Sequence, residues 1–173
     1  MDPICTGSFL MLSNENAMEA YMLMGVPKEE ARVMANPASK NRYEVEVDGN
    51  LIRWQEIYPA APKYNHTYNM RLNETITVET PISMAITATK RNGRTFSCEF
   101  DTGEKQSSCT VTFSPEGFTT KGKNGDLEYT IVFERQEPEV HTDGYIIEML
   151  LLEDKDIHSY VWDVLAWGDL HSL

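Results

Sequence analysis

The stretch of sequence that decides the fold is YEVEVDGNLIRWQEIY, residues 43–58. Its first half alternates apolar residues with acids, which is the period-two pattern of a strand that has one apolar face. Asp48-Gly49-Asn50 then supplies turn residues, and a second strand is expected over residues 51–58. The segment therefore predicts an antiparallel β-hairpin.

Two short helices are predicted before this hairpin. Ser13-Asn14 offers two residue types that are favoured at helix N-caps, and residues 15–24 then read as a helix that stops at Gly25. A second helix is expected from residue 28 to about residue 35, with Asn36-Pro37 as its stop signal. Residues from about 14 to 36 are therefore expected to form a helix-turn-helix, which follows a short apolar stretch at residues 7–11.

Strands are predicted throughout the rest of the chain. Alternating segments occur at residues 64–72, 84–89, 96–100, 109–113, 127–135, 145–152 and 157–164. Asn92-Gly93 is a strong signal for a tight hairpin. Strands at short, even spacing indicate an antiparallel meander that closes into a barrel or a sandwich.

Composition excludes several classes of function. The 173 residues carry 15 Lys+Arg against 27 Asp+Glu, a net charge of −12, so the chain lacks the basic surface that nucleic acids require. No apolar run approaches the ~20 residues that cross a bilayer. The N-terminus shows no signal-peptide pattern, and the three widely spaced cysteines form no disulfide framework. We therefore expect a cytoplasmic protein.

Recognisable catalytic motifs are absent from the sequence. It has no nucleophile elbow, phosphate loop or paired-cysteine motif, and the four histidines are dispersed. We expect no metal site and no cofactor, and we lean against an enzyme. Cys98 and Cys109 are expected to be neighbours across a hairpin, with two separate thiols favoured over a disulfide.

The sequence resembles the intracellular lipid-binding proteins, the family of the cytosolic fatty-acid-binding and bile-acid-binding proteins. The resemblance rests on GSFLM (7–11) followed by Asn16, MGVP (24–27), EVDGN (46–50), WQEIYP (54–59) and YNMRLNE (68–74), of which WQEIYP is most similar to the ileal bile-acid-binding branch. It implies a mainly β, calycin-like fold: a closed antiparallel up-and-down barrel of about ten strands, capped by a helix-turn-helix lid.

The chain also departs from the family pattern. Ala17-Met18 stand where the family has an aromatic residue and then an acid, and Phe133 stands where it places an arginine. The chain has more predicted strands than ten, so the last strand of the barrel falls either at 127–135 or at 157–164. We expect one domain over residues 1–173, with an extra hairpin and tail at about 144–173.

The resemblance implies a non-enzymatic carrier of a fatty acid, bile acid, sterol or retinoid-like molecule. The alternative is an enzyme or photoactive protein that has co-opted the barrel. We expect a monomer with one small hydrophobic partner and with transient membrane contact through the lid. That lid is apolar almost all round, which fits either a plug in the barrel end or an adaptable portal.

A set of residues on the predicted inner faces and on the lid are candidates for ligand binding. These are Met18, Met22, Trp54, Glu56, Tyr58, His66, Tyr68, Met70, Ile86, Phe133 and Arg135. If Trp54, Glu56 and Tyr58 face inward, Glu56 needs a partner such as Arg135, water or a ligand hydroxyl. If they face outward, Arg53, Gln55 and Ile57 point inward instead.

Arg135 is the one cationic anchor expected inside the barrel, and its alternative place is in solvent at the strand end. Two cationic partners for a buried carboxylate are missing from the late strands. The sequence therefore predicts a preference for neutral or hydroxyl-rich ligands.

Overall fold

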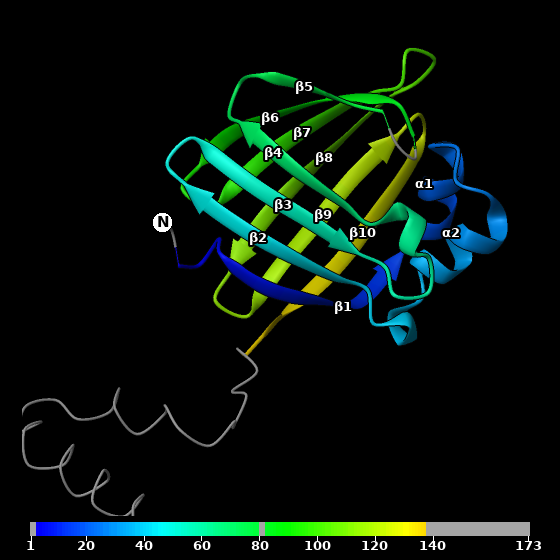
Figure 1. Ribbon diagram of the computed structural model, residues 1–173, viewed down its shortest axis with the longest axis horizontal. Helices are drawn as coiled ribbons and strands as arrows, with labels where there is room; N and C mark the ends of the chain where they lie inside the picture. Colours follow the sequence, from blue (N-terminus) through cyan, green and yellow to red (C-terminus); the bar gives the residue numbers. More distant parts are fainter. Residues whose placement is uncertain (1–2, 80–81, 138–173) are drawn as a thin grey trace, which may run out of the picture. The chain divides into compact units, whose positions relative to one another are not determined.

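The computed structural model describes residues 3–79 and 82–137, which form a β-barrel covered at one end by two helices (Figure 1). The strands are β1 (Gly7–Glu15), β2 (Arg42–Asp48), β3 (Leu51–Ile57), β4 (His66–Arg71), β5 (Thr75–Val78), β6 (Met84–Asn92), β7 (Thr95–Asp101), β8 (Gln106–Ser114), β9 (Gly117–Asn124) and β10 (Leu127–Gln136). Helices α1 (Ala17–Leu23) and α2 (Lys28–Met34) lie between β1 and β2, where they are followed by a short 3-10 helix at Pro37–Ser39. A second 3-10 helix, Pro62–Tyr64, lies between β3 and β4.

All ten strands belong to one antiparallel sheet that follows chain order except at one point. β1 pairs with β2 on one side and with β10 on the other, so Phe9 lies between Tyr43 and Arg135. This pairing places the last strand of the barrel at 127–136, the first of the two positions that the sequence leaves open. The predicted extra hairpin and tail at about 144–173 lie outside the described residues.

The predicted hairpin of residues 43–58 is confirmed. β2 and β3 pair from Asp48 opposite Leu51 to Arg42 opposite Ile57, and the apolar residues of β2 are buried while the acids between them are not. Asn92 pairs with Thr95 across the predicted tight turn between β6 and β7.

The predicted start of the first helix is wrong. Ser13, Asn14 and Glu15 continue β1 and pair with β10, because the sheet satisfies their backbone groups. α1 begins only after Asn16, which turns the chain in a left-handed conformation with φ 57°. The Asn14 side chain is used differently from a helix cap, since its Nδ2 donates to the Ala35 carbonyl at 2.5 Å.

Two strand boundaries also differ from the prediction. Residues 75–78 form β5, a four-residue strand too short and too rich in threonine to stand out from the sequence. The strand expected from residue 64 begins at His66, because Pro62–Tyr64 forms a 3-10 turn. Among the residues that the structure describes, no helix is long and apolar enough to cross a membrane.

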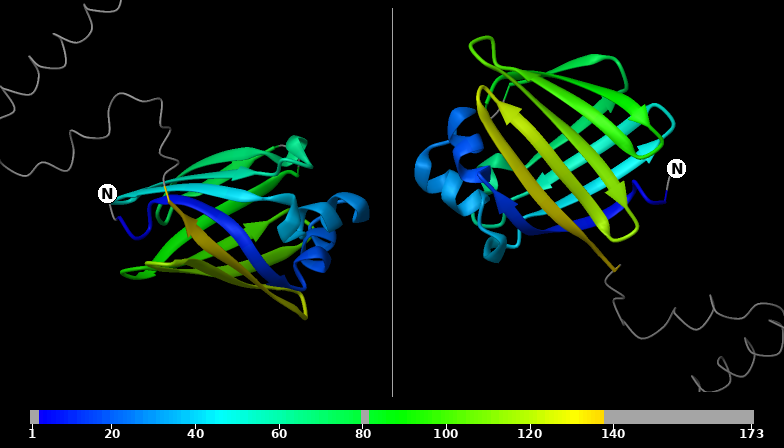
Figure 2. Two further views of the ribbon diagram at one scale, coloured as in Figure 1. Left: turned by 90° about the horizontal axis from the view of Figure 1, so that it is seen from below. Right: turned by 180° about the vertical axis from the view of Figure 1, so that it is seen from behind.

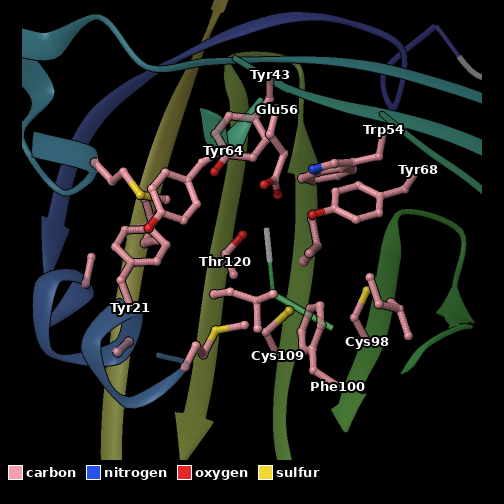
Figure 3. Close-up of a pocket in the computed structure, with 18 of the residues that line it drawn as sticks. Tyr21, Tyr43, Trp54, Glu56, Tyr64, Tyr68, Cys98, Phe100, Cys109 and Thr120 are labelled. Atoms are coloured by element: carbon pink, nitrogen blue, oxygen red, sulfur yellow. The ribbon is translucent and has the colours of Figure 1, made fainter. Parts of the chain in front are cut away.

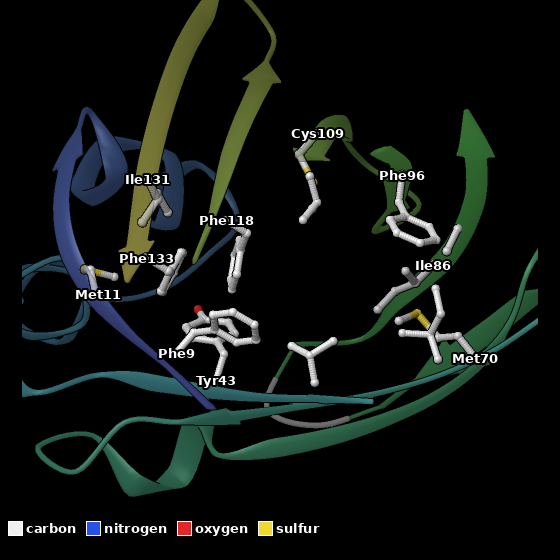
Figure 4. Close-up of a cluster of buried hydrophobic side chains, with 14 of the residues drawn as sticks. Phe9, Met11, Tyr43, Met70, Ile86, Phe96, Cys109, Phe118, Ile131 and Phe133 are labelled. Carbon is white, nitrogen blue, oxygen red and sulfur yellow. The ribbon is translucent and has the colours of Figure 1, made fainter. Parts of the chain in front are cut away.

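Aromatic side chains cluster in the half of the barrel that is farther from the helices (Figure 4), and Figure 2 shows the helices at one end of the barrel. Phe118 stacks on Phe133 with ring centroids 4.3 Å apart, and Tyr43 meets Phe133 edge-on at 4.6 Å. Phe9 packs on Phe118 at 5.0 Å. These rings pack against one another at this end of the barrel, and Tyr43 and Phe133 also line the cavity that extends toward the helices.

Candidate functional site

A cavity of about 170 Å³ lies inside the barrel between the helices and the aromatic cluster (Figure 3). The helical segment contributes Ala17, Ala20, Tyr21, Met24, Val26 and Met34 to its wall. The strands add mainly aliphatic, aromatic and sulfur-containing residues, among them Met70, Met84, Ile86, Cys98, Cys109 and Val111. The site is thus a largely apolar chamber with α1 and the end of α2 in its wall.

Glu56 brings a carboxylate into this apolar chamber (Figure 3). The alternation of β3 turns Trp54 and Glu56 inward, and Tyr58 follows on the same face just after the strand. Arg53 is exposed and pairs with Glu46 on the outer surface at 3.2 Å. The inward face implied by the bile-acid-binding resemblance is therefore confirmed, and the alternative with Arg53 inside is wrong.

Tyrosine hydroxyls gather around the Glu56 carboxylate. Tyr58 Oη donates to Glu56 Oε2 at 3.3 Å, and the Tyr43 and Tyr58 hydroxyls share a hydrogen bond of 2.6 Å. The side chains of Tyr21 and Tyr68 complete the group, and Figure 3 shows the Tyr68 hydroxyl pointing toward Glu56. α1, β2, β3 and β4 thus each place an aromatic side chain in one polar cluster.

Burial changes the acidity of this cluster. It raises the pKa of Glu56 to about 7, although hydrogen bonds from Trp54, Tyr58 and Tyr68 act in the opposite direction. Burial, followed by repulsion from the Glu56 charge, raises the pKa of Tyr21 to about 12. The tyrosines therefore stay neutral near pH 7, while Glu56 is poised between its two protonation states.

Seven of the eleven candidate residues line the cavity. They are Trp54, Glu56, Tyr58, Tyr68, Met70, Ile86 and Phe133. Met18 packs against the core and Met22 is 38% exposed on α1. The His66 ring lies 4.6 Å from the Tyr68 ring at a tilt of 52° and does not line the cavity.

Arg135 lies at the opposite end of the barrel from the helices. Its guanidinium donates to the carbonyls of Thr6 (2.8 Å) and Pro115 (3.0 Å) and lies 4.8 Å from the Phe9 ring centre. The predicted pair between Arg135 and Glu56 is therefore wrong, and so is the alternative of an arginine that contacts nothing. Arg135 ties the N-terminal segment to the β8–β9 turn and helps to close that end.

Several cavity residues were missed by the sequence prediction. Tyr43 is the direct cross-strand neighbour of Glu56, so the register of the predicted hairpin contains the signal for it. Ala17, Ala20, Tyr21 and Met24 follow helical spacing along one face of α1, which would have singled out Tyr21. Tyr129 on β10 shares the alternating face of Phe133, which contains its signal, whereas Thr120 on β9 carried none.

Cys98 and Cys109 face each other across β7 and β8, as predicted. Both side chains reach the cavity, and neither is in a disulfide. A hydrogen bond between the two thiols, together with burial, raises the pKa of Cys109, and the same hydrogen bond lowers the pKa of Cys98. The pair therefore forms a polarizable part of the wall.

Specific contacts hold the two helices over the cavity. Glu30 on α2 accepts hydrogen bonds from the Tyr64 hydroxyl and from Lys63 beside the cavity wall. The buried Asn41 side chain donates to the Met34 carbonyl at 2.6 Å, at the end of α2. Lys105, in the loop between β7 and β8, donates to the Leu23 carbonyl of α1 at 3.0 Å.

The architecture has counterparts among solved structures. The REP1-NXSQ fatty acid transporter matches with a TM-score of 0.66 at 17% sequence identity, covering 78% of this chain and 97% of the transporter. Lipid binding protein 8 of Caenorhabditis elegans gives 0.66 at 16% identity, over 79% and 98% of the two chains. The fluorescent protein UnaG gives 0.66 at 12% identity, over 76% and 96%.

Sequence comparison adds no relative to these structures. No protein-family model matches the chain, and no curated protein sequence matches it. The likeness is therefore one of architecture at low identity. In its ten-stranded barrel and its two-helix cap, the chain has the fold of the intracellular lipid-binding proteins.

Proposed function

We propose that the protein binds a small hydrophobic molecule in the barrel cavity and carries it without changing it chemically. The observation that carries this proposal is the apolar chamber of about 170 Å³ beneath α1 and α2. Burial of apolar ligand surface in such a site contributes roughly 25 cal/mol per Å². The names of two structural neighbours, a fatty acid transporter and a lipid binding protein, support the same general role.

The cavity volume restricts the size of ligand that enters without rearrangement. An apolar cavity of about 150 Å³ holds one benzene molecule, so a chamber of about 170 Å³ suits a compact molecule or a short chain. A fatty acid, bile acid, sterol or retinoid requires the wall to move. Met24, Met34, Met70 and Met84 are suited to this, because methionine repacks around different apolar shapes.

A carrier is favoured over the alternative of an enzyme or photoactive protein. Glu56, with its raised pKa, is the observation on which that alternative would rest. His66, the other candidate for acid–base chemistry, does not line the cavity. The tyrosines that surround Glu56 have raised pKa values and stay neutral near pH 7, so they are poorly matched to proton transfer with it at that pH.

Exchange of the ligand would proceed past the helices. Met22 and Leu23 on α1 are 38% and 37% exposed, which suits the predicted transient contact with a membrane during transfer. The expected monomeric state and cytoplasmic location remain predictions.

Displacement of a fluorescent hydrophobic probe from delipidated protein tests the proposal. Thr120 points into the cavity from β9 (Figure 3), so Thr120→Phe should fill the space and weaken binding at least tenfold. Thr110→Phe on the exposed face of β8 is the matched control and should bind like the wild type. Equal binding by both variants, or no binding of any hydrophobic probe by the folded wild type, would refute the proposal.

A further inference from the structure

Glu56 lacks a cationic partner inside the cavity. The residues described as lining the chamber include no lysine, arginine or histidine, and Arg135 is engaged at the other end of the barrel. A buried carboxylate without a countercharge is costly to keep ionised. A residue that is costly to the empty barrel calls for an explanation in terms of what the barrel binds.

The surroundings of Glu56 are rich in aromatic side chains. Tyr21, Tyr43, Tyr68 and Trp54 line the same region of the cavity as the carboxylate. The face of an aromatic ring attracts a desolvated cation. A carboxylate with aromatic neighbours therefore offers a positive group both a countercharge and favourable ring contacts.

The Tyr21 hydroxyl gives a second, independent sign of an unfilled polar position. Its oxygen is fully buried and forms no hydrogen bond of normal geometry among the described residues, although the Tyr43 and Tyr58 hydroxyls lie beside it. Buried polar atoms are rarely left in this state. A ligand N–H donor placed near Glu56 would also serve this oxygen, which has acceptor capacity.

We infer that the ligand is a lipophilic amine, whose ammonium group lies against Glu56 and the surrounding aromatic residues while its apolar part fills the methionine- and cysteine-lined remainder of the chamber. This inference rests on the proposed function and names the chemical class of ligand for the same site. An ammonium group supplies the missing countercharge and forms charge-assisted hydrogen bonds. A hydroxyl supplies only a neutral hydrogen bond, and a carboxylate would meet Glu56 as a like charge.

Three probes of equal chain length separate these chemistries: octylamine, 1-octanol and octanoic acid, measured by calorimetry on delipidated full-length protein at pH 8. Octylamine should bind at least tenfold more tightly than 1-octanol, and octanoic acid most weakly. Glu56→Gln should remove the advantage of the amine and leave 1-octanol within about twofold. Glu128→Gln removes an equal charge from the exposed face of β10 and should change nothing.

The pH dependence gives a second readout. Octylamine affinity should fall at least fivefold between pH 8 and pH 5.5 as Glu56 takes up a proton, while 1-octanol affinity stays constant. The groups around Glu56 are Tyr21 from α1, Tyr43 from β2, Trp54 and Tyr58 from the β3 segment, Tyr68 from β4, Cys98 from β7, Cys109 from β8 and Tyr129 from β10. The pKa of each tyrosine is raised mainly by burial, and that of Cys109 mainly by its hydrogen bond with Cys98, so these groups do not titrate in this range. The pKa of Cys98 is lowered by the same hydrogen bond, and Glu56→Gln, which keeps Cys98, should therefore bind octylamine equally at the two pH values.

The outcomes distinguish failure of the amine inference from failure of the proposed carrier function. If 1-octanol binds in the cavity and octylamine binds no better, the amine inference fails while the proposed carrier function stands. An amine advantage that survives Glu56→Gln would also overturn the inference. If none of the three probes binds to the folded protein, the proposed function itself fails.

Discussion

Glu56 makes the stability of the empty protein depend on pH. Its pKa rises from 4.5 to about 7 in the folded state because burial disfavours the charged form. Between these two values the folded protein binds more protons than the unfolded chain, so the free energy of unfolding falls as pH rises and levels off above about pH 7. Since one pKa unit corresponds to about 1.4 kcal/mol, the cost approaches roughly 3 kcal/mol.

Glu56→Gln should therefore stabilise the ligand-free protein at pH 8 by roughly 2–3 kcal/mol and leave it nearly unchanged at pH 4.5. Urea unfolding at the two pH values measures the difference. The pKa values of Glu30, Asp101 and Glu116 are lowered in the folded protein, so these carboxylates stabilise it less as the pH falls. Wild type and variant share these contributions, which therefore cancel in the difference between the two proteins. A stability difference that is the same at both pH values would contradict the assigned acidity of Glu56.

At the residue scale, the sequence predicts whether a strand residue points into the barrel better than it predicts how far along the barrel axis that residue lies. Period-two alternation, together with the family resemblance, correctly turned Trp54, Glu56 and Phe133 inward. The same alternation placed Arg135 on the face of Phe133, but no pattern within one strand tells how far along the barrel two inward residues lie. Glu56 is near the helices and Arg135 is at the far end, so depth depends on register between distant strands.

At the element scale, α2 is anchored by a buried side chain from the segment before β2. Asn41 is fully buried, and its Nδ2 donates to the Met34 carbonyl at 2.6 Å, which satisfies a backbone group at the end of the helix. α2 has only seven residues, so its stability depends mainly on such tertiary contacts. The anchor thus connects the strand framework directly to the lid.

Asn41→Ala should lower the free energy of unfolding by about 1–3 kcal/mol, because it leaves buried carbonyls of α2 without a donor. Dissociation of a bound probe should also become faster, since the helices open more readily. Chemical unfolding and stopped-flow displacement measure the two effects. Asn69→Ala, on the exposed face of β4, should alter neither. An unchanged dissociation rate in a destabilised Asn41→Ala protein would separate this anchor from ligand exchange.

The elements themselves were predictable where local signals agree. The hairpins at Asp48 and Asn92 combine alternation with turn residues, and both form as expected. The start of α1 was wrong because Ser13 and Asn14 suit both a helix cap and a strand end. Their strand conformation depends on pairing with β10, which lies more than a hundred residues later in the chain, so the local sequence around Ser13 does not reveal it.

At the scale of the whole molecule, the ten described strands lie within residues 7–136. β10 pairs with β1 and so joins the two halves of a sheet whose edges are β4 and β5, and the described residues include a hydrophobic core cluster. Sequence alone could not choose between two positions for the closing strand, because both segments alternate equally well. In the structure, the segment at 127–136 is the strand that pairs with β1, and it also pairs with β9, the strand before it in the chain.

A chain that ends at Glu137 should therefore fold cooperatively into the same barrel. The sequence predicts that residues 145–165 dock on the barrel, because Tyr145, Ile147, Met149 and Leu151 share an apolar strand face whose burial is favourable. If they dock, removing them should lower the stability of the shortened chain. We expect the shortened protein to keep the circular dichroism spectrum of the barrel and to melt several degrees lower than the full chain. An unfolded shortened chain would contradict the self-sufficiency of the ten strands. An unchanged melting temperature, or rapid proteolysis within residues 145–165 of the native full chain, would contradict docking.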